Sequence, residues 1–334
     1  MVSRRRVLKA ALGATAVLSG IGGPRTARAA EVLKVGTTAP AASPWGQVFK
    51  VWADAVNTKS NGALQLQFFY NGQQGDEAAM VGKVKAGQLD GVSVSSTGLS
   101  KIYKPCVALE MPFLFTTWAK LDAARDAVKS EFEKGIKDAG FALLGWGDVG
   151  IARIFSKGIR TTTPDDIKGK RPWLWRDNLI DPTFYQVIGG VTPVPLNVPE
   201  VLPNLNTGGV NLLAAPALVA EQMQWSSKLD TVVEDVHSVR VGGLVFSAKR
   251  IDSLSEEWRN LVLDTGRVTA NALTKRIRSE DDAAFARMKG KMQVVSWSAD
   301  DRAKWAAIGK QVRQRLAQGT FTADLVAKLE AFAK

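Results

Sequence analysis

Short apolar runs alternate with helix-like periodic segments near the start of the chain. Residues 32–38, 63–70 and 89–96 are rich in Val, Leu and Phe, which predicts buried strands. Between them, Ser43-Pro44 is typical of a helix N-cap followed by a first-turn proline, and residues 76–86 also predict a helix. Apolar side chains recur at helical spacing after that cap, at Trp45, Val48, Phe49, Trp52 and Val56. The order strand, helix, strand, helix, strand predicts a mainly parallel sheet with helices on its faces.

The same alternation continues in the second half of the chain. A helix is expected near 117–138, followed by the apolar segment 141–150. After residue 153 the patterns predict, in order, a strand at 171–175, helices at 181–188 and 199–207, and a strand at 210–216. We therefore expect two α/β units.

The last third of the chain is mostly helical. Residues 237–250 predict an extended return strand, and Ser253 with Glu256 predicts a capping box that opens a helix. Apolar positions at helical spacing continue to Ile277, so this helix is long enough to contact both units. Ser298, with Asp301 three residues later, predicts the start of a terminal helical segment.

The first 29 residues predict an export signal that is removed from the mature protein. SRRRVLK (3–9) resembles the twin-arginine signal, and Ala27-Arg28-Ala29 is typical of a signal peptidase site. An ordinary export signal or a membrane anchor is the alternative, but the apolar run is short for a membrane span. Six lysines and arginines lie in this segment without an acidic residue, so the formal net charge falls from +12 for the full sequence to +6 for the mature chain. That excess is modest and spread among acidic residues, so we expect neither nucleic-acid binding nor stable membrane insertion.

The residues that carry most catalytic and metal chemistry are scarce. Cys106 is the single cysteine and His237 the single histidine, which excludes an intrachain disulfide and disfavours zinc sites and Ser-His or Cys-His catalysis. GWGDVG (145–150) matches a dinucleotide fingerprint with Asp165 downstream, but the β-rich residues 151–160 replace the helix that would bind a pyrophosphate. We therefore expect no catalytic residues, cofactor or metal, although an oxygen-ligand metal site stays open.

Five segments follow one another along most of the mature chain: VGTTAPAASP (35–44), YNGQQGDEAAMVGKVKAGQLDG (70–91), LEMPFLF (109–115), TPDDIKGKR (163–171) and PVPLNVPEVLPNLNTGGVN (193–211). Together they resemble the solute-binding proteins of TRAP (tripartite ATP-independent periplasmic) transporters. The resemblance implies an α/β, two-domain periplasmic binding protein fold, with crossing strands, a long helix spanning both domains and a cleft that closes on one small molecule. It also implies a periplasmic location and delivery of the ligand to a membrane permease driven by an ion gradient.

On this basis we expect domain I at 30–152 with part of 240–275, and domain II at 153–239 with the C-terminal helices 276–334. A binding protein of an ABC importer is an alternative, although the lipid-anchored cysteine that such proteins often carry near the signal is absent here. An exported enzyme is the other alternative, and it would require a polar, titratable cleft.

Two positions depart from the family pattern. The resemblance implies an arginine four residues after the glycine of the Asp166–Gly169 turn, where it would bind a ligand carboxylate, but Trp173 occupies that position. A polar residue, often asparagine, is usual before Pro216, and this chain has Ala215 there. Both changes replace polar ligand contacts with apolar ones, so we expect a small organic acid with an apolar or aromatic body.

The candidate binding residues follow from these departures. Trp173 and Trp175 lie two residues apart in a predicted strand, so their rings would share one face as a pocket wall, or would fill the core. Arg153 is a candidate replacement for the carboxylate anchor, or a surface ion-pair partner. Further candidates are Trp45 and Thr97, which follow strand ends, and Trp225 after the Pro216 segment; helix packing or turn formation would equally explain them.

Overall fold

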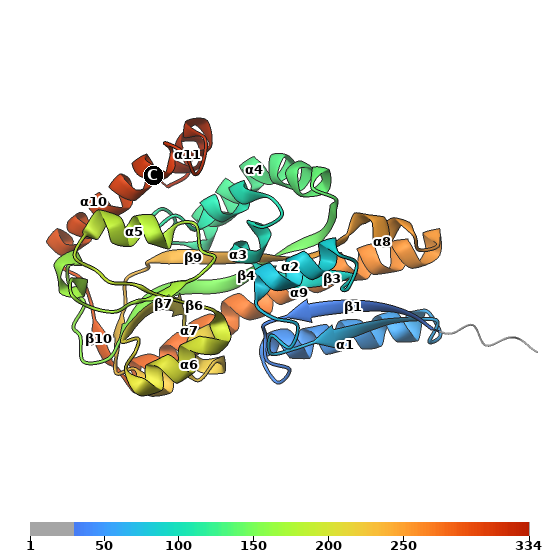
Figure 1. Cartoon of the computed structure of the whole chain (residues 1–334), viewed down its shortest axis with the longest axis horizontal. Helices are drawn as coiled ribbons and strands as arrows, with labels where there is room; N and C mark the ends of the chain where they lie inside the picture. The colour runs from blue at the N-terminus through green and yellow to red at the C-terminus, as the bar shows by residue number, and fades with distance from the viewer. Residues whose placement is uncertain (1–29, 334) are drawn as a thin grey trace, which may run out of the picture.

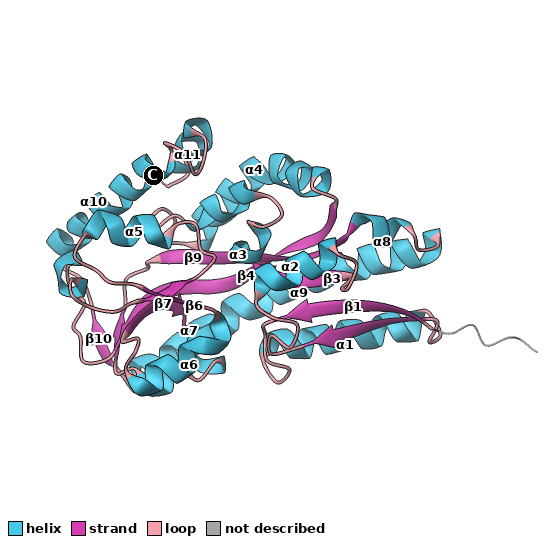
Figure 2. Ribbon diagram, viewed as in Figure 1, coloured by secondary structure: helices cyan, strands magenta, loops and turns pink. Residues whose placement is uncertain are grey.

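The computed structural model describes residues 30–333 and contains one large mixed sheet. Eight strands form it in the order β10-β8-β4-β9-β3-β1-β2, with β7 also paired to β4, and β5 and β6 form a separate two-stranded sheet (Figures 1 and 2). The strands are β1 (Glu31–Thr37), β2 (Leu64–Phe69), β3 (Gly91–Ser95), β4 (Phe141–Ser156), β5 (Trp173–Trp175), β6 (Val194–Leu196), β7 (Leu212–Pro216), β8 (Thr231–Val233), β9 (Ser238–Ser247) and β10 (Gln293–Val295).

Helices cover the sheet and connect its strands. The α-helices are α1 (Pro44–Lys59), α2 (Glu77–Lys85), α3 (Ser96–Leu99), α4 (Trp118–Asp138), α5 (Asp181–Ile188), α6 (Val198–Thr207), α7 (Ala217–Gln222), α8 (Ala248–Asp252), α9 (Glu256–Lys289), α10 (Ala299–Leu316) and α11 (Ala323–Glu330). The 3₁₀ helices are η1 (Lys104–Glu110), η2 (Pro164–Ile167) and η3 (Trp225–Lys228).

The N-terminal unit matches the pattern of strands and helices that its sequence predicts. β1 pairs in parallel with both β2 and β3, and α1 and α2 form the connections between them. Ser43 caps α1 by accepting a hydrogen bond from the Gly46 amide, and Pro44 follows in the first turn. The apolar stripe of α1 is buried at Phe49, Trp52 and Val56 because the helix packs on the sheet with that face.

Two long antiparallel strands join the N-terminal unit to the rest of the molecule. β9 pairs with β3 on one side and with β4 on the other, and the β4–β9 register runs from Phe141 opposite Ser247 to Ala152 opposite Ser238. The mainly parallel arrangement expected from the sequence holds for β1, β2 and β3, whereas the whole sheet is mixed because β9 pairs antiparallel with β3 and β4. β4 and β9 are the crossing strands that the resemblance implied, since residues 141–156 form one strand and the sheet continues through both halves.

The long helix is present, and its start differs from the sequence-based prediction. α9 has 34 residues and packs against α1, β4 and α7, so it extends along both halves of the molecule (Figure 1). Ser255 caps α9 through the Trp258 amide, whereas Ser253 ends the short helix α8 and donates its hydroxyl to the Arg250 carbonyl. The predicted cap at Ser253 was therefore wrong, because the return strand ends at Ser247 and a helical turn intervenes.

Two hydrophobic clusters form the core. One contains Phe132 of α4 and Trp305 of α10, and the other contains Phe49 of α1, Trp225 of η3 and Ile277 of α9. All five side chains are at most 2% exposed, so each cluster buries large apolar areas contributed by distant parts of the chain. No helix within residues 30–333 has the length and apolar character that a membrane span requires.

The single histidine is buried in an aromatic environment. The His237 ring lies edge-on to Phe113 at 5.2 Å and to Phe184 at 5.1 Å between ring centroids. Burial, and secondarily the charge of Arg240, lowers the pKa of His237 to about 3. The folded protein therefore holds this imidazole neutral at every pH near neutrality.

We expect this neutral histidine to contribute a defined pH dependence to stability. Unfolded histidine binds a proton below about 6.5 and folded His237 only near 3, so the stability it contributes is lost as pH falls through that window. Between pH 7 and pH 5 the loss is about 2 kcal/mol. In urea unfolding, the free-energy penalty of His237→Gln should therefore be smaller at pH 5 than at pH 7 by that amount. An equal penalty at both pH values would contradict a buried neutral imidazole.

Candidate ligand-binding cavity

One cavity lies where the two halves of the molecule meet. Its empty volume is about 1110 Å³, which includes space that is open to solvent. Thr37 and Ser95, at the ends of β1 and β3, line it from the N-terminal half, and Ala215 of β7 lines it from the second half. Gly243 of β9 and Leu273 of α9 complete the lining from the shared elements. Its place at the carboxyl ends of the parallel strands is where α/β sheets usually bind ligands.

Four of the residues that line the cavity are tryptophans. Trp173 and Trp175 both line the cavity, and their rings stack at 5.9 Å between centroids with 27° between planes. Trp225 also lines it and meets the Trp173 ring edge-on at 5.0 Å. We call Trp45, Trp173, Trp175 and Trp225 the tryptophan wall, since Trp45 of α1 lines the same cavity. Trp173 also fills the core, which was the alternative interpretation, because it is only 8% exposed and belongs to a core cluster.

Hydrogen bonds hold the indole rings of the wall in place. The Trp173 Nε1 donates to the Leu196 carbonyl at 3.1 Å, which ties β5 to β6. Trp175 Nε1 donates to Asp76 Oδ2 at 2.9 Å, and the Val198 amide donates to the same oxygen at 3.3 Å. Asp76 Oδ1 meanwhile accepts the Glu77 amide and caps α2. One carboxylate therefore connects the N-terminal half directly to β5 and α6.

The remaining sequence candidates divide into two groups. Thr97 and Ala215 line the cavity together with the tryptophan wall. Arg153 is not among the lining residues: its guanidinium lies 3.6 Å from the ring centroid of Phe285 of α9, and its Nε donates to the Glu234 carbonyl. The position of Arg153 does not support a ligand anchor, because its side chain packs beneath α9 instead of reaching the cavity.

The cationic group that does line the cavity is Arg240 of β9, which was not among the candidates predicted from the sequence. Its Nη1 donates to Glu110 Oε2 at 2.8 Å, and Glu110 Oε1 accepts the Val241 amide at 2.8 Å. Burial raises the pKa of Glu110, and the charge of Arg240 opposes this. Among the lining residues of the described chain, Arg240 is the only lysine or arginine. The sequence feature that could have identified it is that Arg240 is a single arginine within the apolar return strand.

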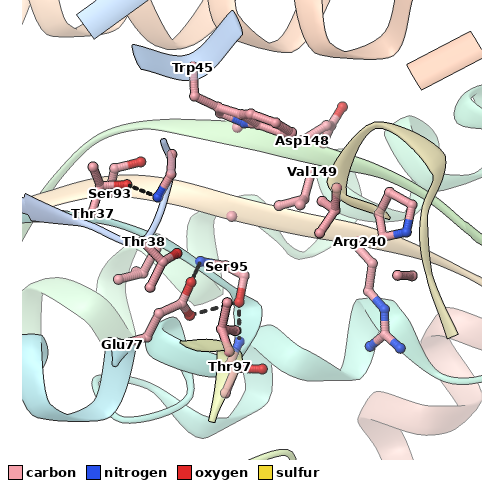
Figure 3. A pocket seen from close by; sticks show the side chains of 18 of the residues that line it. Thr37, Thr38, Trp45, Glu77, Ser93, Ser95, Thr97, Asp148, Val149 and Arg240 are labelled. Carbon is pink, nitrogen blue, oxygen red and sulfur yellow. Dashed lines mark hydrogen bonds between the residues drawn. The ribbon is translucent and has the colours of Figure 1, made fainter. Parts of the chain in front are cut away.

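A second polar group surrounds Glu77. The carboxyl oxygens of Glu77 accept hydrogen bonds from the Ser95 amide at 2.9 Å, the Ser95 hydroxyl at 2.7 Å and the Gly98 amide at 2.8 Å. Figure 3 shows this group, with Thr97 beside it, apart from the side chain of Arg240. Burial raises the pKa of Glu77 to about 8, although the hydrogen bonds from Ser95 and Gly98 act in the opposite direction. Glu77 therefore contributes little negative charge to the cavity at neutral pH.

Asp148, a third acidic lining residue, is paired with two arginines. Asp148 of β4 accepts hydrogen bonds from Arg125 Nη1 at 2.7 Å and from Arg278 Nε at 2.6 Å. Arg278 comes from α9 and also pairs with Asp122 at 2.6 Å. Two arginines thus compensate the charge of the buried Asp148. Without such partners, a buried carboxylate charge would be costly in free energy.

No metal-binding arrangement is evident among residues 30–333, where His, Cys, Asp and Glu side chains form no group of three that could hold an ion. GWGDVG (145–150) lies inside β4, where no helix begins that could bind a pyrophosphate. The cavity instead combines a large apolar wall with a few polar groups, which is typical of a site that binds a small organic molecule.

A cavity between two α/β halves that share long strands defines the class of two-domain solute-binding proteins. The DctP family, described as bacterial extracellular solute-binding protein family 7, matches residues 35–319. The chain belongs to this family, whose members bind solutes for TRAP transporters and are not enzymes.

Individual relatives agree with this assignment. The 2,3-diketo-L-gulonate-binding periplasmic protein YiaO of Escherichia coli is 25% identical over 79% of this chain and 80% of its own length. The structure of the sugar acid binding protein DctPAm from Advenella mimigardefordensis, in complex with galactonate, has a TM-score of 0.84 at 18% identity and covers 91% of this chain and 98% of its own. A TRAP periplasmic solute-binding protein from Sulfurospirillum deleyianum with bound succinate has a TM-score of 0.83 at 18% identity, over 91% and 99%. The solved structures establish the shared two-domain fold.

Proposed function

We propose that this protein acts in the periplasm, where it captures an organic acid with an apolar or aromatic body and delivers it to a TRAP membrane permease. The tryptophan wall is the observation that carries the proposal, because it offers an extended apolar surface inside the cavity. Family membership supports the transport role, and carboxylates are the ligands named for the relatives described above. The predicted export signal, which would direct the chain to the periplasm, lies outside the described residues.

The ligand carboxylate is proposed to bind Arg240. Within the described chain, the hydrogen bonds of this guanidinium use only Nη1, so Nε and Nη2 are free to donate to a ligand. Glu110 holds the arginine in place without occupying its other donors. Arg240 would thus take the anchoring role for which Arg153 was one candidate.

Ligand capture is proposed to close the two domains around the crossing strands. The moving bodies would be residues 30–152 with part of 240–275, and residues 153–239 with 276–334. Contacts between the halves would stabilise the closed form: Asp76 accepts hydrogen bonds from Trp175 and Val198, and Lys101 pairs with Asp177 at 2.8 Å. β-bulges at Leu143/Gly145 and Asp148/Gly150 interrupt the register of β4 beside the cavity, where bending is easiest.

The experiment that tests this function combines a ligand screen with solution scattering. Mature protein should show a higher melting temperature with aromatic or branched monocarboxylates, and a smaller radius of gyration when the best of them is bound. Asp76→Ser keeps a good helix cap but removes the acceptor for Trp175 and Val198, so it should weaken binding about tenfold. Asp165→Asn, on the surface, is the matched control. It should change neither the rise in melting temperature on ligand binding nor the decrease in radius of gyration.

Two results would contradict the proposed function. If no organic acid stabilises the protein, the binding role is wrong. If a ligand binds tightly without any compaction, the cavity does not close by domain movement.

A further inference from the structure

One of the acidic residues that line the cavity has no ion-pair or hydrogen-bond partner for its carboxylate among the described residues. The acidic lining residues are Glu77, Glu110, Asp148 and Asp181. Glu110 is paired with Arg240, Asp148 with two arginines, and Glu77 receives three hydrogen bonds. Within residues 30–333, the Asp181 carboxylate has neither a salt bridge nor a hydrogen bond to its oxygens. It is therefore the acidic group of the cavity that lacks a donor.

The start of α5 places this carboxylate at the cavity. Asn178 Oδ1 accepts the Ile180 amide at 2.7 Å and the Asp181 amide at 2.8 Å, which fixes the turn that enters the helix. Asn178 and Asp181 both line the cavity, as does Arg240. Burial raises the pKa of Asp181, and the nearby charge of Arg240 only partly offsets this. Asp181 and Arg240 therefore place an unpartnered acceptor and a guanidinium donor in the lining of the same cavity.

This arrangement disfavours a simple anionic ligand. The positive charge of Arg240 is already balanced by Glu110, so a bound carboxylate would add a second uncompensated negative charge beside Asp181. A ligand that carries a positive group beside its own carboxylate adds no net charge to the cavity. It would also supply the hydrogen-bond donors that Asp181 lacks.

We propose that the ligand is an α-amino acid with an apolar or aromatic side chain. Its carboxylate binds Arg240, its ammonium group binds Asp181, and its side chain packs on the tryptophan wall. This inference rests on the proposed function and narrows the substrate class of the same cavity. Asp181 is then the residue that distinguishes amino acids from other organic acids.

The test compares three compounds with one carbon skeleton. L-phenylalanine, L-3-phenyllactate and 3-phenylpropionate differ only in carrying an ammonium, a hydroxyl or a hydrogen beside the carboxylate. Isothermal titration of the wild-type protein at pH 7.5 should show that phenylalanine binds at least tenfold more tightly than 3-phenylpropionate. The corresponding indole series tests a larger side chain in the same way.

The variant Asp181→Asn keeps the size of the side chain and removes its charge. It should weaken phenylalanine binding at least tenfold and leave 3-phenylpropionate binding unchanged or tighter, while Asp165→Asn should preserve the wild-type order. A thermal melt of each variant verifies that it is folded.

Wild-type protein that binds 3-phenylpropionate as tightly as phenylalanine would overturn the inference but leave the proposed function in place. An unchanged preference for phenylalanine in folded Asp181→Asn protein would also overturn it. If none of the phenyl or indole acids binds, both the inference and the proposed preference for an apolar body fail.

Discussion

Removing the charge of Arg240 is expected to weaken binding of a carboxylate ligand by about 30-fold or more, roughly 2 kcal/mol, because hydrogen bonds to charged groups contribute 1.5–3 kcal/mol. Arg240→Gln alone would leave Glu110 buried without its partner, at a cost of about 3–5 kcal/mol in stability. The binding test is therefore the double variant Arg240→Gln/Glu110→Gln, in which two neutral amides replace the ion pair. Isothermal titration after a thermal melt measures the loss in folded protein.

Arg153→Gln is the matched control for this experiment. Its guanidinium stacks on Phe285 outside the cavity lining, so the substitution should lower stability and leave ligand affinity within about twofold. If the Arg153 variant lost affinity while the Arg240/Glu110 variant retained it, the anchor would be the one that the sequence first suggested.

Trp173→Ala is expected to weaken ligand binding at least tenfold, about 1.4 kcal/mol. A stacked aromatic contact contributes about 0.5–1.5 kcal/mol beyond the area it buries, and the buried area adds roughly 25 cal/mol per Å². Titration with the native ligand measures the change.

The packing of Trp173 makes a second variant necessary. The ring is 8% exposed and contacts both Trp175 and Trp225, so its removal should also cost about 3–5 kcal/mol of stability. Trp173→Phe retains an aromatic face and should keep affinity within a few-fold. Unchanged affinity in folded Trp173→Ala protein, or a native ligand that is a small dicarboxylate, would contradict the role of the tryptophan wall.

Much of the fold could be predicted because its signals are local. The strands and helices of the N-terminal unit, the caps at Ser43 and Ser298, and the length of α9 all follow from periodicity and capping over short segments. That Trp173 and Trp175 share one face follows from strand alternation in the same way. These features depend on residues a few positions apart, so the sequence alone determined them.

The tertiary structure decided which polar groups meet at the cavity. Arg153 and Arg240 are both single arginines in apolar strands, and only the packing of α9 over Arg153 shows that Arg240 is the one that lines the cavity. Arg240 reaches Glu110 across 130 residues of chain, and Asp76 reaches Trp175 across 99. Local periodicity carries no information about such contacts, because they arise when β4 and β9 join distant segments in one sheet. The sequence by itself therefore determined the class of fold and the aromatic character of the cavity, while the charged residues that select a ligand became evident only from the packing.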